Sequence, residues 1–324
     1  MLKHGGRLRE AAQTYSIPLA NWIDLSTGIN PHGYPIPAIP AAAWQRLPEE
    51  QDGLMAAAQA YYQSENILAV AGSQAAIQTL PLLRPKGMIG ILAPSYAEHA
   101  HAWQKAGHEL RTIDVEKIDT LIHQLDTLIL VNPNNPTGQT FSPEQCLHWL
   151  EILNKKQGWL IIDEAFIDAT PELSLSTFSP RKGLIILRSI GKFFGLAGIR
   201  SGFVLAEQPI LDTLNEHLGP WTLSNPSRLV TAEALKNQAW QTQTRTQLQQ
   251  QSQRLQQLLS EHQLPPTGSN ALFQWVKTEQ AKQLHQQLAQ QAVFTRLFNQ
   301  PNSLRFGLPE NENAWQQLTQ ALKL

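Results

Sequence analysis

The chain has 324 residues, 42% of them hydrophobic and 16% charged, which is enough for a large apolar core and predicts two domains. Its formal net charge is −1, its isoelectric point is about 6.8 and no basic block is present, so nucleic acids and anionic membranes are poor candidate partners. The single cysteine, Cys146, excludes an intrachain disulfide framework and a multi-cysteine metal site.

The same features predict a cytoplasmic protein that binds no metal. One cysteine fits a reducing compartment. Residues 1–6 lack the apolar core of a signal peptide. No apolar run approaches the roughly 18 residues of a membrane span, so we expect no membrane partner.

The first part of the chain reads as an arm. Residues 1–40 are rich in proline and glycine, and we expect an extended arm with one short helix that packs with a small domain. A helix is predicted over 54–63, with Leu54, Ala58, Tyr61 and Tyr62 on one side.

Short apolar runs then alternate with helical patterns. Unbroken apolar strands separated by helices are typical of a mostly parallel sheet that is covered on both faces, so we predict an α/β fold. One of the helices is expected at 143–155. The strand candidates are 67–70, 89–92, 128–131, 159–162, 184–187 and 202–205.

The composition changes after Pro226. Residues 237–263 are dense in glutamine and could be low-complexity disorder, but leucines at 248, 255, 258 and 259 favour a long amphipathic helix. Strand-like pieces at 272–276 and 303–306 complete a smaller α+β domain. The predicted division is therefore an arm over 1–40, a large α/β domain over 41–235 and a small domain over 236–324.

Lys192 is flanked by small and apolar residues, and it follows the apolar run 184–187. Burial of an amine lowers its pKa toward neutrality, and a neutral amine forms Schiff bases with aldehydes. A lone lysine in such a loop is far more often an ordinary surface residue. A reactive role for Lys192 therefore needs support from other residues that would form a site with it.

Polar and aromatic side chains follow four of the predicted strands. Tyr96 follows 89–92, Asn135 follows 128–131, Asp163 follows 159–162, and Ser189 and Lys192 follow 184–187. Each has an ordinary explanation, such as a turn, a helix cap or a core ring. Because ligands of parallel sheets bind at the carboxyl ends of the strands, their joint occurrence there favours a binding site.

This set of groups suits pyridoxal phosphate. That cofactor needs a lysine for its aldehyde, an acid beside its ring nitrogen, a donor near its ring hydroxyl and an aromatic ring to stack on. Lys192, Asp163, Asn135 and Tyr96 match these needs in that order. Candidates for a phosphate cradle are Gly72, Ser73 and Gln74 at the start of a helix, with Ser189 and Arg200.

The segments NPNNPTG (132–138), DEAF (163–166) and SIGKFFGLAGIRSGF (189–203) resemble those of fold-type I pyridoxal-phosphate enzymes in the histidinol-phosphate aminotransferase branch. Within that branch, HGGRLREAA (4–12), WIDLSTGINPHGYP (22–35) and WQRLPEEQDGL (44–54) resemble the threonine-phosphate decarboxylases of cobalamin biosynthesis. The resemblance implies a large α/β domain, a small domain and a homodimer.

The resemblance also implies roles for individual residues. Lys192 would hold the cofactor and Asp163 would pair with its ring nitrogen. In VFTRLF (293–298) and SLRFGLP (303–309), Arg296 would bind the substrate phosphate and Arg305 the carboxylate. The remaining substrate contacts implied in this way are His4, Gly5 and Asn30.

Two positions depart from the aminotransferases of this branch. They commonly carry tyrosine where this chain has Phe166, which leaves more of the contact with the ring oxygen to Asn135. The branch also often has a tyrosine before an arm proline that reaches the partner subunit's cofactor, whereas Leu47 precedes Pro48 here. Both differences weaken an aminotransferase interpretation.

The resemblance therefore predicts decarboxylation of L-threonine O-3-phosphate to (R)-1-aminopropan-2-ol O-2-phosphate. The alternative enzyme is an aminotransferase of the histidinol-phosphate type, because the two reactions differ only in which bond of the substrate is positioned for cleavage. A third hypothesis is a non-catalytic cofactor-binding or interaction protein that kept the fold.

Overall fold

The computed structural model describes residues 4–323, and its chain forms two compact units. The first unit holds 34–135 and 140–241; the second holds 136–139 and the described residues up to 33 and from 242 onward. The domain boundaries predicted after residues 40 and 235 stay a prediction. The expectation that there is no signal peptide rests partly on residues 1–3, which lie outside the described residues.

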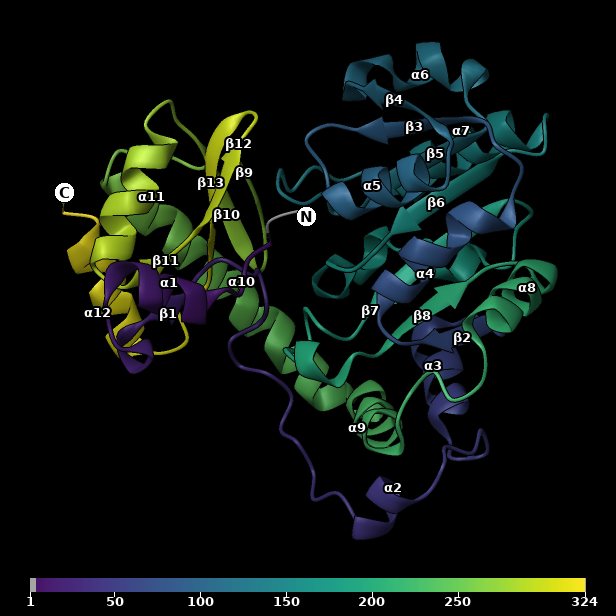
Figure 1. The fold of residues 1–324 in the computed structure, drawn as a ribbon, viewed down its shortest axis with the longest axis horizontal. Helices are drawn as coiled ribbons and strands as arrows, with labels where there is room; N and C mark the ends of the chain where they lie inside the picture. The colour runs from purple at the N-terminus through teal and green to yellow at the C-terminus, as the bar shows by residue number, and fades with distance from the viewer. Residues whose placement is uncertain (1–3, 324) are drawn as a thin grey trace. The chain divides into compact units, whose positions relative to one another are not determined.

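A seven-stranded sheet forms the centre of the first unit, in the order β2-β8-β7-β6-β5-β3-β4 (Figure 1). Strands β3 to β7 run parallel in their pairs, while β8 is antiparallel to both of its neighbours. The mostly parallel sheet predicted from the sequence is therefore confirmed. The strands are β2 (Ile67–Val70), β3 (Met88–Leu92), β4 (Glu109–Ile113), β5 (Thr127–Val131), β6 (Trp159–Asp163), β7 (Leu184–Ser189) and β8 (Gly202–Leu205).

Helices α4 (Ser73–Thr79), α5 (Ala97–Lys105) and α8 (Gln208–Leu218) share an apolar core with one face of this sheet. That core includes Ile129 and Ile161. The alternate residues of the same strands point to the opposite face and are buried as well, so both faces are covered.

The predicted helices at 54–63 and 143–155 are confirmed as α3 (Leu54–Tyr62) and α7 (Pro143–Asn154). Ser142 and Gln145 begin α7 with a capping box, in which each side chain bonds the other residue's backbone N–H. The other helices of this unit are α2 (Ala41–Gln45), α6 (Ile118–Leu121) and α9 (Asn225–Lys236).

The second unit contains a four-stranded antiparallel sheet and a parallel pair of short strands. The sheet consists of β12 (Arg296–Asn299), β13 (Asn302–Gly307), β10 (Phe273–Lys277) and β9 (Gly268–Asn270), and β1 (Ile23–Asp24) pairs with β11 (Val293–Phe294). Its helices are α1 (Leu8–Tyr15), α11 (Ala281–Gln290), α12 (Glu312–Ala321) and most of α10 (Gln238–Glu261).

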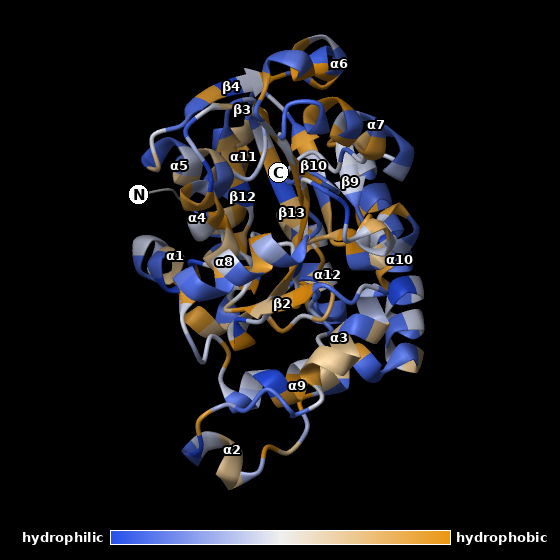
Figure 2. Ribbon diagram, turned by 90° about the vertical axis from the view of Figure 1, so that its right-hand side faces the viewer, coloured by the Kyte–Doolittle hydropathy of each residue, from blue (hydrophilic) through white to orange (hydrophobic). Residues whose placement is uncertain are grey.

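The glutamine-rich tract forms the long helix α10, as its leucine stripe predicts. Leu248, Leu255 and Leu259 are buried, and Leu258 is half-buried. Figure 2 shows the hydrophilic character of most other residues of this helix. Across residues 4–323, no helix has both the length and the apolar character needed to cross a membrane.

A buried ion network ties β7 to the segment after β6. The guanidinium of Arg188 donates to Glu164 Oε2 at 2.6 Å and to Asp168 Oδ1. The hydroxyls of Ser174 and Ser176 also accept hydrogen bonds from Arg188. Burial lowers the pKa of Arg188, but the charges of Asp168 and Glu164 raise it by more, so the arginine stays charged.

Replacing Arg188 with methionine removes the cation but leaves both carboxylates buried. We expect the free energy of unfolding to fall by about 3–5 kcal/mol, the usual cost of breaking a buried ion pair from one side. Urea unfolding followed by circular dichroism measures this. Lys182→Met, at an exposed position before β7, is the control and should stay within about 0.5 kcal/mol of the parent. Equal stability of the two variants would contradict a structural role for the network.

Candidate active site

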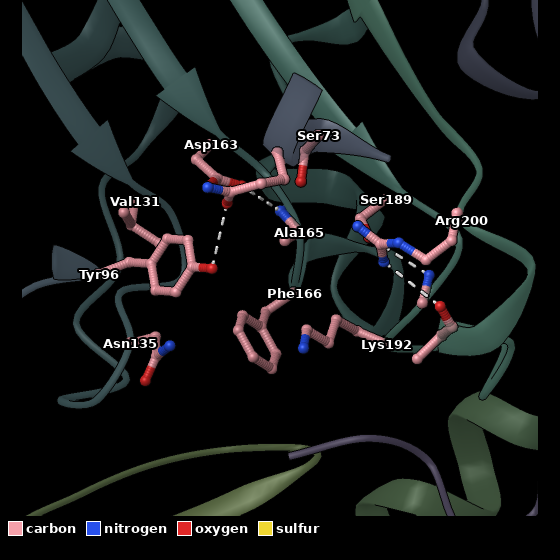
Figure 3. A pocket seen from close by; sticks show the side chains of 13 residues that line it. Ser73, Tyr96, Val131, Asn135, Asp163, Ala165, Phe166, Ser189, Lys192 and Arg200 are labelled. Carbon is pink, nitrogen blue, oxygen red and sulfur yellow. Dashed lines mark hydrogen bonds between the residues drawn. The ribbon is translucent and has the colours of Figure 1, made fainter. Parts of the chain in front are cut away.

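Polar side chains from several strand ends line one pocket at the carboxyl edge of the central sheet (Figure 3). The lining residues are Ser73, Gln74, Tyr96, Val131, Asn135, Asp163, Ala165, Phe166, Ser189, Gly191, Lys192, Ala197 and Arg200. Every predicted cofactor ligand except Gly72 is among them. Gly72 lies against Arg200, because a Cβ placed on it would be 2.8 Å from a guanidinium nitrogen.

Lys192 lies on a tight turn after β7 that aromatic packing holds in place. Gly195 N–H donates to the carbonyl of Lys192 at 3.1 Å. The next two residues, Phe193 and Phe194, are fully buried, and each ring centre lies 5.7 Å from the ring of Trp240. The anchored backbone leaves the half-buried Lys192 side chain in the pocket, with its amine 5.6 Å from the ring centre of Phe166.

Asp163 ends β6 and is only 2% exposed. Its Oδ1 accepts the Ala165 backbone N–H at 3.0 Å, and its Oδ2 lies 2.9 Å from His99 Nε2. The imidazole of His99 is equally buried, so the carboxylate is held at both oxygens. Hydrogen bonds to both oxygens fix the orientation of this carboxylate.

Sequence reasoning missed His99. It lies one helical turn after Tyr96 on α5, which places both side chains on the same side of that helix. This spacing is the available signal. This signal can be used only when the first residue of α5 is known, because His101 lies on the same helix but is exposed.

Tyr96, Gln74 and Glu98 form a chain of hydrogen bonds beside the pocket. Tyr96 Oη donates to Gln74 Oε1 at 3.3 Å, and Gln74 Nε2 donates to Glu98 Oε2 at 3.0 Å. Burial raises the pKa of Tyr96 to about 12, and the charges of Asp163 and Glu98 contribute to the increase. The phenol therefore stays protonated near neutral pH and can continue to donate.

One side of the pocket has the composition of a phosphate site. Ser73 begins α4, and Ser189 and Arg200 lie nearby in the same pocket. Gly202, at the start of β8, packs directly against the start of α4. A Cβ on Gly202 would lie only 2.8 Å from the backbone nitrogen of Ser73. A guanidinium, hydroxyls and the backbone N–H groups of a helix start suit a phosphate.

The residues predicted to contact substrate, His4, Gly5, Asn30, Arg296 and Arg305, belong to the second unit. Arg296 and Arg305 are direct partners on neighbouring antiparallel strands, β12 and β13. Burial lowers the pKa of Arg305 to about 9, and the charge of Arg296 adds to the decrease. An anion bound beside these groups would compensate for both effects.

The other predicted substrate residues have local contacts in the same unit. Asn30 is 2% exposed, and its Oδ1 accepts the backbone N–H of His32 at 2.9 Å. Gly5 lies so close to Ser26 that a Cβ would be 2.3 Å from the Ser26 carbonyl oxygen. His4 is half-buried.

Comparison with known proteins places the chain among enzymes of related sequence and fold. It is 54% identical to a threonine-phosphate decarboxylase of Pseudomonas aeruginosa, over 99% of this chain and 97% of that protein. A threonine-phosphate decarboxylase of a Sinorhizobium species is 37% identical, over 98% and 97% of the two chains.

Solved structures show the same fold. The crystal structure of histidinol-phosphate aminotransferase from Sinorhizobium meliloti, in complex with pyridoxal-5'-phosphate, has a TM-score of 0.83 at 19% identity and covers 99% of this chain and 94% of that one. The family model "Aminotransferase class I and II" matches residues 21–321, nearly the whole sequence. The chain therefore belongs to the family of class I and II aminotransferases.

Proposed function

We propose that the protein is a pyridoxal-phosphate-dependent decarboxylase that converts L-threonine O-3-phosphate to (R)-1-aminopropan-2-ol O-2-phosphate for cobalamin biosynthesis. The observation that carries the proposal is the 54% identity, along nearly the full length of both chains, to the Pseudomonas aeruginosa threonine-phosphate decarboxylase. The pocket at the sheet edge supplies the chemical groups that such an enzyme needs.

The pocket residues fit pyridoxal phosphate. Its phosphate suits the side formed by Gly72, Ser73, Gln74, Ser189 and Arg200, where a guanidinium approaches a glycine too closely for any side chain. Tyr96 offers a ring for stacking, and Asn135 a donor for the ring oxygen. When bound, the cofactor supplies an aldehyde and a cationic ring that withdraws electrons from the substrate's Cα.

Asp163 and Lys192 carry out the proton chemistry in this proposal. The carboxylate of Asp163 holds a proton on the ring nitrogen, and His99 keeps that carboxylate in position at 2.9 Å. The amine of Lys192 would hold the aldehyde until the amine of the substrate displaces it, and the released Lys192 would take up a proton that the substrate's ammonium group gives up. After carbon dioxide leaves, Lys192, now an ammonium group, would deliver this proton to the substrate Cα. Phe166 shields this amine from water on one side.

Arg296 and Arg305 bind the anionic groups of the substrate. Arg305 takes the carboxylate and Arg296 the phosphate, with His4, Gly5 and Asn30 as further contacts. Arg305 is 4% exposed and is the direct cross-strand partner of Arg296, and two guanidinium groups placed in this way suit an anionic ligand. Held at both ends, the substrate has one Cα bond aligned for cleavage.

We also propose that the protein acts as a homodimer. Trp44, Leu47 and Trp221 are 68%, 63% and 60% exposed. A second copy would bury such residues, and homodimer interfaces are rich in large apolar side chains. The cytoplasmic location remains a prediction.

Purified protein supplied with pyridoxal phosphate and L-threonine O-3-phosphate should release carbon dioxide and form the aminoalcohol phosphate. L-threonine without phosphate is the control and should react far more slowly, because it lacks the group that Arg296 binds. Trapping of carbon dioxide together with mass spectrometry of the product measures the reaction. Formation of glutamate from 2-oxoglutarate without carbon dioxide would establish the aminotransferase instead.

A Lys192→Ala variant should lose the absorbance that the bound cofactor gives near the visible edge. Its decarboxylation rate should fall by about 10²- to 10⁴-fold, because the amine both binds the aldehyde and moves a proton. Lys182→Ala changes an exposed lysine of the same unit and should keep the band and the rate. An unchanged band together with an unchanged rate in Lys192→Ala would contradict this role of Lys192.

The contact between His99 and Asp163 also gives a test. His99→Leu removes a hydrogen bond to a buried charged group, which is worth about 1.5–3 kcal/mol, so kcat/KM should fall by about ten- to a hundredfold. His101→Leu, on the exposed side of α5, is the matched control and should behave as the parent. Titration with cofactor, followed by absorbance, separates weaker binding from slower chemistry. Equal rates in the two variants would remove His99 from the proposal.

A further inference from the structure

The N-terminal segment is held against Ser26 by contacts that depend on two consecutive glycines. A Cβ on Gly5 would lie 2.3 Å from the Ser26 carbonyl oxygen and 2.8 Å from its carbon, so a side chain there would collide with backbone. The backbone N–H of Gly6 donates to Ser26 Oγ at 2.8 Å, and Gly6 has a φ of +79°. The N-terminal segment therefore packs closely against Ser26 and turns immediately before Arg7.

Ser26 connects this segment to one of the proposed substrate ligands. It is fully buried, and its carbonyl accepts a hydrogen bond from Arg305 Nη2 at 2.7 Å. Its backbone N–H and hydroxyl both donate to Asp24 Oδ1, at 2.8 and 2.6 Å. Ser26 thus contacts both the turn at Gly5 and Gly6 and the buried guanidinium of Arg305, and fixes one relative to the other.

Helix α1 fixes the position of Arg7 from the other side. Ala11 of this helix packs in an apolar cluster with Trp22, Ala289 and Ala292, and Phe294 contacts the same cluster. Arg7 lies at the start of α1, where its guanidinium donates to Glu10 Oε2 at 3.0 Å. Both members of this ion pair are substantially solvent-exposed, at 39% and 63% of their side chains, so it contributes little stability.

The contacts with Ser26 bring three arginines together: Arg7 follows Gly6, which bonds Ser26, Arg305 donates to the same Ser26, and Arg296 is the direct cross-strand partner of Arg305. Burial lowers the pKa of Arg296, and the charge of Arg7 lowers it further. Burial likewise lowers the pKa of Arg305, with Arg296 adding to the decrease and Asp24 opposing it. An anion bound beside these guanidinium groups would reduce the repulsion between them.

We propose that Arg7 is a further ligand of the substrate's phosphate group, acting together with Arg296, while Arg305 is reserved for the carboxylate. The inference deepens the proposed function and rests on it for the identity of the substrate. A phosphomonoester is a dianion with three terminal oxygens, so it can accept hydrogen bonds from two guanidinium groups at once. On binding, Arg7 exchanges its exposed contact with Glu10 for the phosphate.

The test uses the holoenzyme and compares Arg7→Gln with Arg9→Gln. Arg9 is an exposed arginine of the same helix and serves as the matched control. We expect Arg7→Gln to raise KM for L-threonine O-3-phosphate by about ten- to a hundredfold with kcat changed little, because a charge-assisted hydrogen bond is lost in binding. Arg9→Gln should match the parent, and Arg7→Lys should recover part of the affinity because it keeps the charge but not the fork geometry.

Calorimetric titration with inorganic phosphate separates this inference from the proposed reaction. If the parent binds phosphate and Arg7→Gln binds it at least tenfold more weakly, Arg7 is an anion ligand even if threonine phosphate is not decarboxylated. Equal phosphate affinity in the parent and Arg7→Gln would overturn the inference, whether or not the reaction occurs. The inference also fails if the parent binds no phosphate, or if Arg9→Gln weakens binding as much as Arg7→Gln. Urea unfolding of each variant shows that the fold is retained.

Discussion

The parallel alignment of β3, β5, β6 and β7 is the constraint on which the candidate site depends. Their carboxyl ends converge on one edge of the sheet, so residues far apart in sequence line a single pocket. The strands themselves are apolar and buried on both faces, which leaves the polar chemistry to the segments that follow them. A change of register in β6 would move Asp163 away from the pocket.

Rigidity near this edge comes from buried polar pairs. Asp163 is held at both oxygens, and its neighbour Glu164 is fixed by Arg188. Such pairs add little net stability compared with apolar packing, and their value lies in holding charged groups in one geometry. The aromatic packing of Phe193 and Phe194 does the same for the Lys192 turn.

Much of the fold could be predicted because buried parallel strands read as unbroken apolar runs. Strand β4 was not predicted, since this edge strand is mostly polar and only Ile113 is fully buried. The candidate cofactor ligands could be predicted because most of them lie in the segments that directly follow the apolar runs of the strands. To predict the contact of His99 with Asp163, one must know where α5 begins. To predict the pairing of Arg296 with Arg305, one must know the register of β12 against β13. The sequence pattern alone specifies neither.

Binding of pyridoxal phosphate through Lys192 is central to the proposed chemistry of the pocket. Borohydride reduction of the loaded protein, followed by proteolysis and mass spectrometry, tests it most directly because reduction fixes the cofactor to the lysine that holds it. We predict one modified peptide, within 189–203, with the added mass on Lys192. Modification of a different lysine, or no modification after loading with cofactor, would contradict this role of Lys192.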